Sequence, residues 1–204
     1  MQEEKKLTEK ESLDLITQMI NSAKQEQKDD GKGWIIWGWL LFLASGLTYL
    51  NLQFRWFSNY FFWNLFGAVS AILLLYSVVK WLYFNKKQKV KTYTRDLFAK
   101  LNIGFFIFLV LIIVSINTGV QPVKGFALLI ALYGFWILIY GAALNFRPSI
   151  IAAFITWGFA LGALFVKENG FDITMLLHGT AVLIGYIIPG YIANREFKRA
   201  ASKK

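Results

Sequence analysis

Six long apolar stretches, separated by polar segments, run through most of this chain. They cover residues 34–52, 60–84, 101–120, 125–144, 148–166 and 173–193. An α-helix rises about 1.5 Å per residue, so about 20 residues cross the hydrocarbon core of a bilayer. Because lipid offers no partner to a free backbone amide, each stretch is predicted to be helical. The pattern therefore predicts an all-α fold, a polytopic membrane bundle of six transmembrane helices.

The segments between the apolar stretches carry residues that are typical of turns and helix ends. Pro122 and Pro148 fall near the first turns of the fourth and fifth stretches, where a missing amide hydrogen costs little. Asn169 and Gly170 indicate a turn, and Asp172 is predicted to cap the sixth helix. Since the connections are short, we expect helices that follow one another in the sequence to pack as antiparallel neighbours.

Lysine and arginine are distributed unevenly among the polar segments. Eighteen of them lie before the first stretch, between the second and third, between the fourth and fifth, and after the sixth. The alternate segments hold three, which are Arg55, Lys124 and Lys167. Cytoplasmic loops of membrane proteins carry an excess of these two residues. The distribution therefore predicts a multi-pass protein whose N- and C-termini are both cytoplasmic.

Composition agrees with this topology and excludes several classes of function. Of the 204 residues, 56% are hydrophobic and 17% are charged, whereas soluble domains are about 25% charged. The net charge of +10 is concentrated beside the ends of the apolar stretches and not on one basic soluble face, so we expect no nucleic-acid partner. The chain has no cysteine, which excludes disulfides, thiolate metal sites and cysteine nucleophiles.

The chain divides into three regions. Residues 1–33 are predicted to form a cytoplasmic amphipathic helix and hinge, residues 34–194 the six-helix transmembrane domain, and residues 195–204 a basic cytoplasmic tail. The first region is not expected to be a signal peptide, because it has no apolar core and contains eight acidic residues.

The amphipathic helix is predicted to begin at a capping box, Thr8 to Glu11. Its apolar face comprises Leu13, Ile16, Met19 and Ile20, with Leu15 and Ala23 beside them. A helix that lies on anionic lipid carries mostly Lys and Arg on its polar side, whereas this one mixes acids with bases. The face is therefore predicted to contact a second copy, the chain's own 85–100 segment or a cytosolic regulatory protein; docking on lipid is the alternative.

The segment ESLDLITQMI, the polar hinge that follows and the sequence WIIWGW resemble a family of uncharacterised bacterial six-span inner-membrane proteins with an amphipathic N-terminal helix. The closing segment GYIIPGYIANREFK, which starts at Gly185, resembles the same family. Members of such families are often encoded beside small winged-helix regulators. The resemblance thus implies the bacterial inner membrane and a signalling or regulatory role, and it implies no catalytic residues.

His178 is the only histidine and lies within the sixth stretch. An ionisable residue inside a membrane is a candidate functional residue. Asn64 and Asn117 are placed at a similar depth, and the three side chains are predicted to line one small polar cavity that binds a ligand, or else to form separate interhelical hydrogen bonds. No second histidine or cysteine completes a metal site, so no metal or cofactor is expected.

Tryptophans of membrane proteins are enriched at the two membrane–water interfaces. Two tryptophans of this chain are instead predicted to lie near the middle of the bilayer. Trp136 and Trp157 lie about 12 to 16 Å into their helices, by the rise of 1.5 Å per residue. Together with Thr156 they are predicted to line a pocket for an apolar or aromatic molecule. This pocket is the second candidate ligand site.

Small residues recur within several stretches. Gly158 and Gly162 form a GxxxG motif that is extended by Ala153 and Ala163, and small residues at this spacing let helix backbones approach closely. Packing within the chain is favoured over dimerisation for this motif, and Gly134 and Gly141 are interpreted in the same way. The Pro-Gly pair at 189–190 is predicted to kink the sixth helix near its cytoplasmic end.

The sequence contains no pattern typical of an enzyme or a channel. No paired carboxylates lie within a stretch, no serine has a nearby base, and the single histidine has no positioned partner. A charged ring or a carbonyl filter sequence is also missing. We therefore expect a non-catalytic sensor, regulatory or interaction scaffold, with a transporter or exporter of a small apolar or aromatic solute as the alternative.

Overall fold

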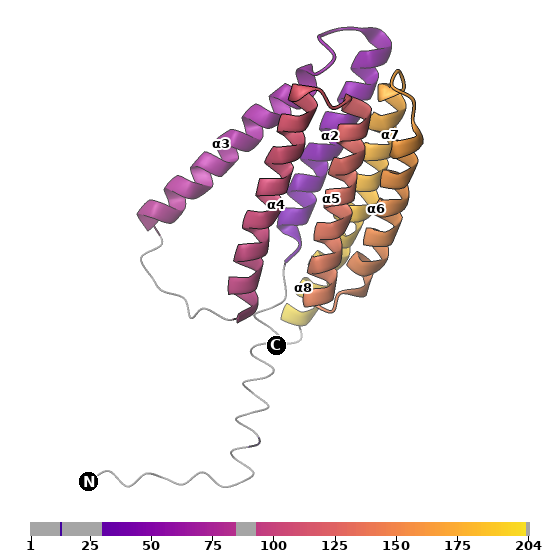
Figure 1. The fold of residues 1–204 in the computed structure, drawn as a ribbon. Helices are drawn as coiled ribbons and strands as arrows, with labels where there is room; N and C mark the ends of the chain where they lie inside the picture. Colours follow the sequence, from indigo (N-terminus) through magenta and orange to yellow (C-terminus); the bar gives the residue numbers. More distant parts are fainter. Residues whose placement is uncertain (1–12, 14–29, 85–92, 203–204) are drawn as a thin grey trace, which may run out of the picture.

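The computed structural model describes residue 13, residues 30–84 and residues 93–202. In these residues all regular structure is helical, so the all-α prediction is confirmed. The elements are α2 (Lys32–Phe54), α3 (Phe61–Phe84), α4 (Tyr93–Thr118), α5 (Pro122–Ala143), α6 (Arg147–Phe165), α7 (Phe171–Val182), the π-helical segment η1 (Leu183–Ile187) and α8 (Ile188–Ala201) (Figure 1). The predicted apolar face of the N-terminal helix lies outside the described residues, except for Leu13.

Five helical stretches are long and apolar enough to cross a membrane. They are Lys32–Phe54, Leu97–Thr118, Pro122–Ala143, Arg147–Phe165 and the continuous stretch Phe171–Ala200. The described part of α3 contains a shorter apolar stretch, Phe61–Leu73. The chain is therefore a helical bundle with the composition of a membrane protein.

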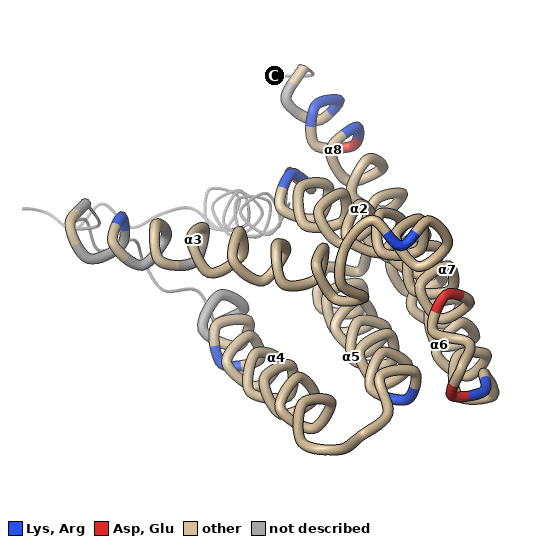
Figure 2. The backbone as a smooth tube through the Cα atoms, turned by 90° about the horizontal axis from the view of Figure 1, so that it is seen from above, with Lys and Arg blue, Asp and Glu red and all other residues tan. Residues whose placement is uncertain are grey.

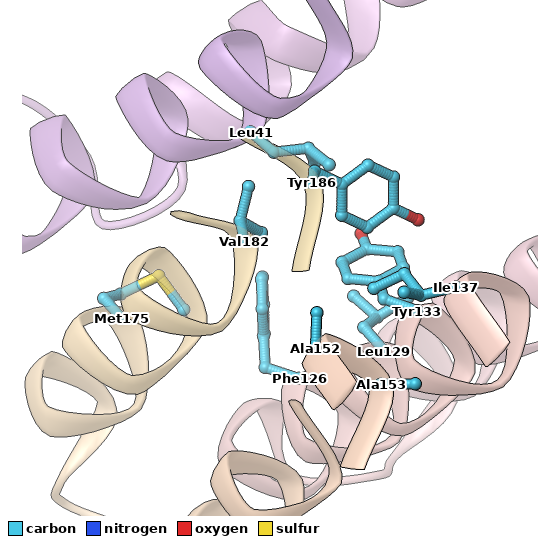
Figure 3. Packing of buried hydrophobic residues seen from close by; sticks show 10 residues of the cluster. All are labelled: Leu41, Phe126, Leu129, Tyr133, Ile137, Ala152, Ala153, Met175, Val182 and Tyr186. Carbon is cyan, nitrogen blue, oxygen red and sulfur yellow. The ribbon is translucent and has the colours of Figure 1, made fainter. Parts of the chain in front are cut away.

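The core of the bundle is formed by α2, α5, α6 and α7, which lie side by side in Figure 1. The helix α7 and the η1 segment that continues it contact α2, α5 and α6. Buried side chains from these elements point toward one another between the helices (Figure 3). They are Leu41, Phe126, Leu129, Tyr133, Ile137, Ala152, Ala153, Met175, Val182 and Tyr186. This packing encloses His178, the central residue of the first candidate site described below.

Two glycines of α5, Gly134 and Gly141, lie in close contact with residues of α6. A Cβ atom added to Gly134 would lie 2.5 Å from Cδ1 of Trp157, whose indole nitrogen donates a hydrogen bond of 3.0 Å to the carbonyl of Ala131. A Cβ atom at Gly141 would meet Ile150 at 2.9 Å. The prediction that these two glycines serve packing within the chain is confirmed.

The same prediction is wrong for the GxxxG motif of α6. A Cβ atom added to Gly158 or Gly162 would meet nothing within 4 Å, and both glycines are exposed. The prediction is confirmed for the two alanines that extend the motif, because Ala153 and Ala163 lie on the other side of α6 and are fully buried. Both sides of α6 carry small residues, so their spacing alone could not show which side faces the bundle.

The helices α3 and α4 do not pack on each other within the described residues, contrary to the expectation that all sequential helices are neighbours. The backbone of α3 approaches only α2, and the backbone of α4 approaches only α5. Figure 1 shows α3 leaning away from the other helices toward its C-terminal end. No residue of Leu97–Thr118 in α4 is buried.

Helix ends follow the predictions in part. Pro122 and Pro148 occupy the first turns of α5 and α6, and a turn hydrogen bond of 2.9 Å joins the Gly170 amide to the Lys167 carbonyl. The capping role of Asp172 is wrong, because α7 begins one residue earlier, after Gly170. The Asp172 carboxylate accepts the amide of Ile173, at 2.8 Å, within the first turn.

The sixth span contains a π-helical segment directly before the Pro-Gly pair at which a kink was predicted. The segment Leu183–Ile187 is π-helical, and the amide of Ile188 donates to the carbonyl of Leu183. Pro189 has no amide hydrogen with which to continue the regular ladder. The extra residue of the π turn lies where proline removes an α-helical bond, which is a common position for such turns.

Candidate functional site

The first candidate site is built around His178, which lies on α7 and faces α2. Its side chain has 0% of its surface exposed. Nδ1 of the imidazole lies 2.6 Å from Oγ of Ser45, and this hydroxyl also donates a bond of 2.9 Å to the carbonyl of Leu41. The bond between His178 and Ser45 joins residues 133 positions apart and fixes the rotation of α7 relative to α2.

Three aromatic rings surround the imidazole. Trp63 from α3 lies 5.2 Å from it between ring centroids, and Tyr133 and Phe126 from α5 lie 5.5 and 5.7 Å away. All three meet the imidazole nearly edge to face, at interplanar angles of 87°, 72° and 79° in that order. Edge-to-face pairs are favourable for aromatic rings. His178 is thus enclosed by apolar ring surface on the sides that Ser45 does not cover.

The second imidazole nitrogen, Nε2, is buried and has no hydrogen-bond partner. If the Ser45 hydroxyl donates to Leu41, Nδ1 carries the hydrogen and Nε2 is an unpaired acceptor. If the hydroxyl donates to Nδ1 instead, Nε2 carries a hydrogen that has no acceptor. In both tautomers Nε2 is the one nitrogen of His178 that is left to bind something else.

The predicted polar cavity of Asn64, Asn117 and His178 is not formed. Asn64 and Asn117 are exposed, and the Asn117 amide donates 2.7 Å to the carbonyl of Ile113 in its own helix. A fully buried His178 cannot line an open cavity with them. Depth along each helix was predicted from the sequence, but the direction in which each side chain points was not.

The residues of the second candidate pocket face three different neighbours. Trp136 packs on Phe105 of α4, with ring centroids 5.2 Å apart. Trp157 lies against Gly134 of α5, and Thr156 faces Gly185 of η1. The three side chains serve three separate contacts between helices and do not line one pocket. The Thr156 hydroxyl is buried without a hydrogen-bond partner.

Sequence reasoning missed the residues that enclose His178. The side of α2 that faces α7 is small or polar, which is unusual in an apolar helix, and its buried residues are Gly38, Leu41, Ala44, Ser45, Thr48 and Asn51. Their spacing of three or four residues is the signal that could have identified this face. No comparable signal distinguishes Trp63, Phe126 and Tyr133 among the many aromatic residues of the chain.

The other two buried polar side chains of α2, Thr48 and Asn51, bond within their own neighbourhood. The Thr48 hydroxyl donates to the Ala44 carbonyl at 2.6 Å. The Asn51 side chain donates to the carbonyls of Phe57 and Ser58, at 3.2 and 3.0 Å, and accepts the Phe57 amide at 2.8 Å. Asn51 thereby holds the connection from which α3 starts. Among the described residues, no three His, Asp or Glu side chains are placed to hold a metal ion.

Comparison of the chain with protein-family models, with curated proteins and with solved structures finds no match. The resemblance to the bacterial six-span family therefore stays a prediction. What the His178 site does has to be inferred from its own geometry, which is that of a closed aromatic enclosure with one unpaired nitrogen.

Proposed function

We propose that the chain is a six-span protein of the bacterial inner membrane that acts as a non-catalytic sensor or regulatory scaffold. Five membrane-length apolar helices and the apolar start of α3 support the six-span count. Figure 2 shows the charged residues at or near the ends of the described helices. The excess of Lys and Arg on the side of both termini supports a cytoplasmic location for the termini.

The orientation is tested by labelling single cysteines in intact cells with a membrane-impermeant maleimide. The natural chain has no cysteine, so each substitution gives one reactive site. Asn59→Cys and Asn169→Cys are expected to react from outside, because their segments hold few positive charges. Gln88→Cys and Ser202→Cys are expected to react only after the membrane is opened. Reaction of Gln88→Cys in intact cells would reverse the proposed topology.

The packing around His178 is the observation that favours a scaffold over a transporter. The only ionisable side chain near the middle of α7 is sealed between rings. Transporters of polar solutes place ionisable or discontinuous elements beside a central binding site that opens to water. The π segment η1 is a discontinuity, but three of its residues, Gly185, Tyr186 and Ile187, are buried against neighbouring helices.

The scaffold function is tested on the N-terminal helix. Replacing Ile16 and Ile20 with aspartate places charge on its predicted apolar face and is expected to reduce oligomer mass or contact with the 85–100 segment, because buried charge is costly. Crosslinking and mass photometry of the detergent-solubilised protein measure the change. Thr17→Asp with Asn21→Asp, on the predicted polar side, is the matched control and is expected to have no effect.

Two results would contradict this function. A chain lacking residues 1–30 with unchanged oligomer mass and unchanged crosslinks would remove the role of the helix. Saturable uptake of a small aromatic solute into proteoliposomes, lost in His178→Ala, would favour the transporter alternative.

A further inference from the structure

We propose that His178 is the hydrogen-bonding residue of a ligand site that Trp63 closes in this conformation, and that the ligand is a small aromatic compound with one hydroxyl group, dissolved in the bilayer. The inference rests on the proposed function, since it names the class of molecule that the sensor would detect.

The unpaired nitrogen is Nε2 of His178. Burying a polar atom without a partner costs free energy, and such atoms in folded proteins are rare. The rest of the side chain is well held, because Nδ1 is bonded to Ser45 at 2.6 Å. The imidazole is therefore positioned by one nitrogen and left with the other available, which is the arrangement expected of a residue that binds a ligand.

Apart from Trp63, the side chains that form the enclosure belong to the tightly packed part of the bundle. Phe126 and Tyr133 lie on α5, which contacts α4, α6 and α7. His178 lies on α7 and Ser45 on α2, two helices in extensive contact. These side chains are nearly or completely buried, with exposed fractions of 5% or less. These four side chains are therefore held by contacts within the bundle other than those with Trp63.

Trp63 closes the remaining side of the enclosure, and its helix is attached to the bundle by fewer contacts than α5 or α7. Trp63 lies on α3, whose backbone approaches only α2 among the described helices. Its indole nitrogen donates 3.2 Å to the sulfur of Met175, which is a weak acceptor. Beyond Trp63, α3 leans away from the bundle (Figure 1) and carries exposed apolar side chains such as Leu65 and Ile72. A displacement of α3 would open the enclosure toward lipid rather than toward water.

The chemistry of the enclosure selects the ligand. A molecule that replaces the Trp63 ring meets the ring of Phe126, which lies 4.8 Å from that of Trp63 between centroids, so a flat aromatic ring is favoured. A hydroxyl group both donates and accepts, so it pairs with Nε2 in either tautomer of His178. An uncharged phenol dissolves in the bilayer and meets both requirements. A charged or strongly polar ligand would lose its hydration without gaining enough partners.

The single histidine makes a direct test possible. We would incorporate ¹⁵N-labelled histidine into the full chain in lipid nanodiscs, so that the two ring resonances report His178 alone. Addition of 4-ethylphenol is expected to shift the Nε2 resonance saturably and to leave Nδ1, which Ser45 holds, nearly unchanged. The matched probe 4-ethyltoluene has the same ring without the hydroxyl and is expected to leave Nε2 unchanged. An Nε2 resonance that stays fixed, or moves equally with both probes, would overturn the site.

The role of Trp63 as the lid is tested with a smaller side chain. If a closed state must open before binding, the apparent affinity is reduced by the population of the open state. Trp63→Leu is therefore expected to lower the half-saturating concentration of 4-ethylphenol at least several-fold. Trp56→Leu, which changes an exposed tryptophan of the preceding connection, is the matched control and is expected to have no effect.

If Trp63→Leu and Trp56→Leu change the half-saturating concentration equally, Trp63 does not close the site. These resonances do not depend on topology or oligomer mass, so failure of the ligand site and failure of the scaffold function give different results. A fixed Nε2 resonance beside a normal oligomer would leave a scaffold without this ligand. A phenol-dependent Nε2 shift beside unchanged oligomer mass and crosslinks after deletion of residues 1–30 would leave the ligand site without the proposed scaffold.

Discussion

Replacing Gly134 with alanine is expected to lower the stability of the bundle by about 1 to 3 kcal/mol, the usual cost of overpacking. The added Cβ atom would lie 2.5 Å from Cδ1 and 2.6 Å from Nε1 of Trp157. The indole cannot move aside without breaking its 3.0 Å bond to the Ala131 carbonyl. The Gly134 substitution must therefore separate α5 from α6 or displace Trp157, and these two helices form the largest contact in the bundle.

Gly158→Ala is the matched control, because it makes the same chemical change in the middle of α6. A Cβ atom at Gly158 meets nothing within 4 Å, and alanine favours a helix over glycine by about 1 kcal/mol. Stability is therefore expected to stay the same or rise. Thermal unfolding of the detergent-solubilised protein measures the stability of both variants. In a chain of this size, a change of 1 kcal/mol shifts the midpoint temperature of unfolding by about 2 to 4 °C. A larger loss at Gly158 than at Gly134 would mean that the GxxxG side of α6 is covered by protein in the membrane.

The helices themselves were predictable because lipid leaves the backbone no alternative to a helix. The predicted stretch 148–166 became Arg147–Phe165, and 34–52 became Lys32–Phe54. The third stretch was predicted to start at residue 101, whereas α4 begins at Tyr93. Hydropathy marks the part of a helix that fits lipid, and a helix can continue beyond that part into water.

Rotation about the helix axis was the part that the sequence left undetermined. In a soluble helix the apolar side identifies the core, but in a membrane helix the outside is apolar as well. This is why Gly158 was assigned to the interior and found outside, while Ser45 was overlooked. The buried side of α2 carries three polar residues, Ser45, Thr48 and Asn51, whose spacing indicates the direction of that side.

The undetermined rotation of the helices also limited the prediction of the candidate site. His178 was predicted from its chemical type alone, and it is the one candidate with a buried unpaired nitrogen. Its companions were chosen by depth, and depth does not bring side chains together when their helices are rotated differently. The residues that do enclose it are aromatic rings from α3 and α5, which a chain with 18% aromatic residues does not single out.

His178→Ala is expected to cost about 2 to 5 kcal/mol of stability, the range for removing a large buried side chain. The substitution removes a side chain with 0% exposure that packs on three rings, and it leaves the Ser45 hydroxyl without its partner in α7. Asn117→Ala is the matched control and is expected to cost less than about 0.5 kcal/mol. The Asn117 side chain is exposed and bonds only to its own helix.

Double mutants distinguish this arrangement from a shared polar cavity. The costs of His178→Ala and Asn117→Ala are expected to add within about 0.5 kcal/mol, because the two side chains share no partner. The costs of His178→Ala and Ser45→Ala are expected to deviate from additivity by about 0.5 to 3 kcal/mol, since either change alone breaks the same 2.6 Å bond. Coupling between His178 and Asn117 as large as that between His178 and Ser45 would show that polar groups of α4 and α7 meet in the membrane. In that case the closed aromatic enclosure would be only one of the conformations that the bundle adopts.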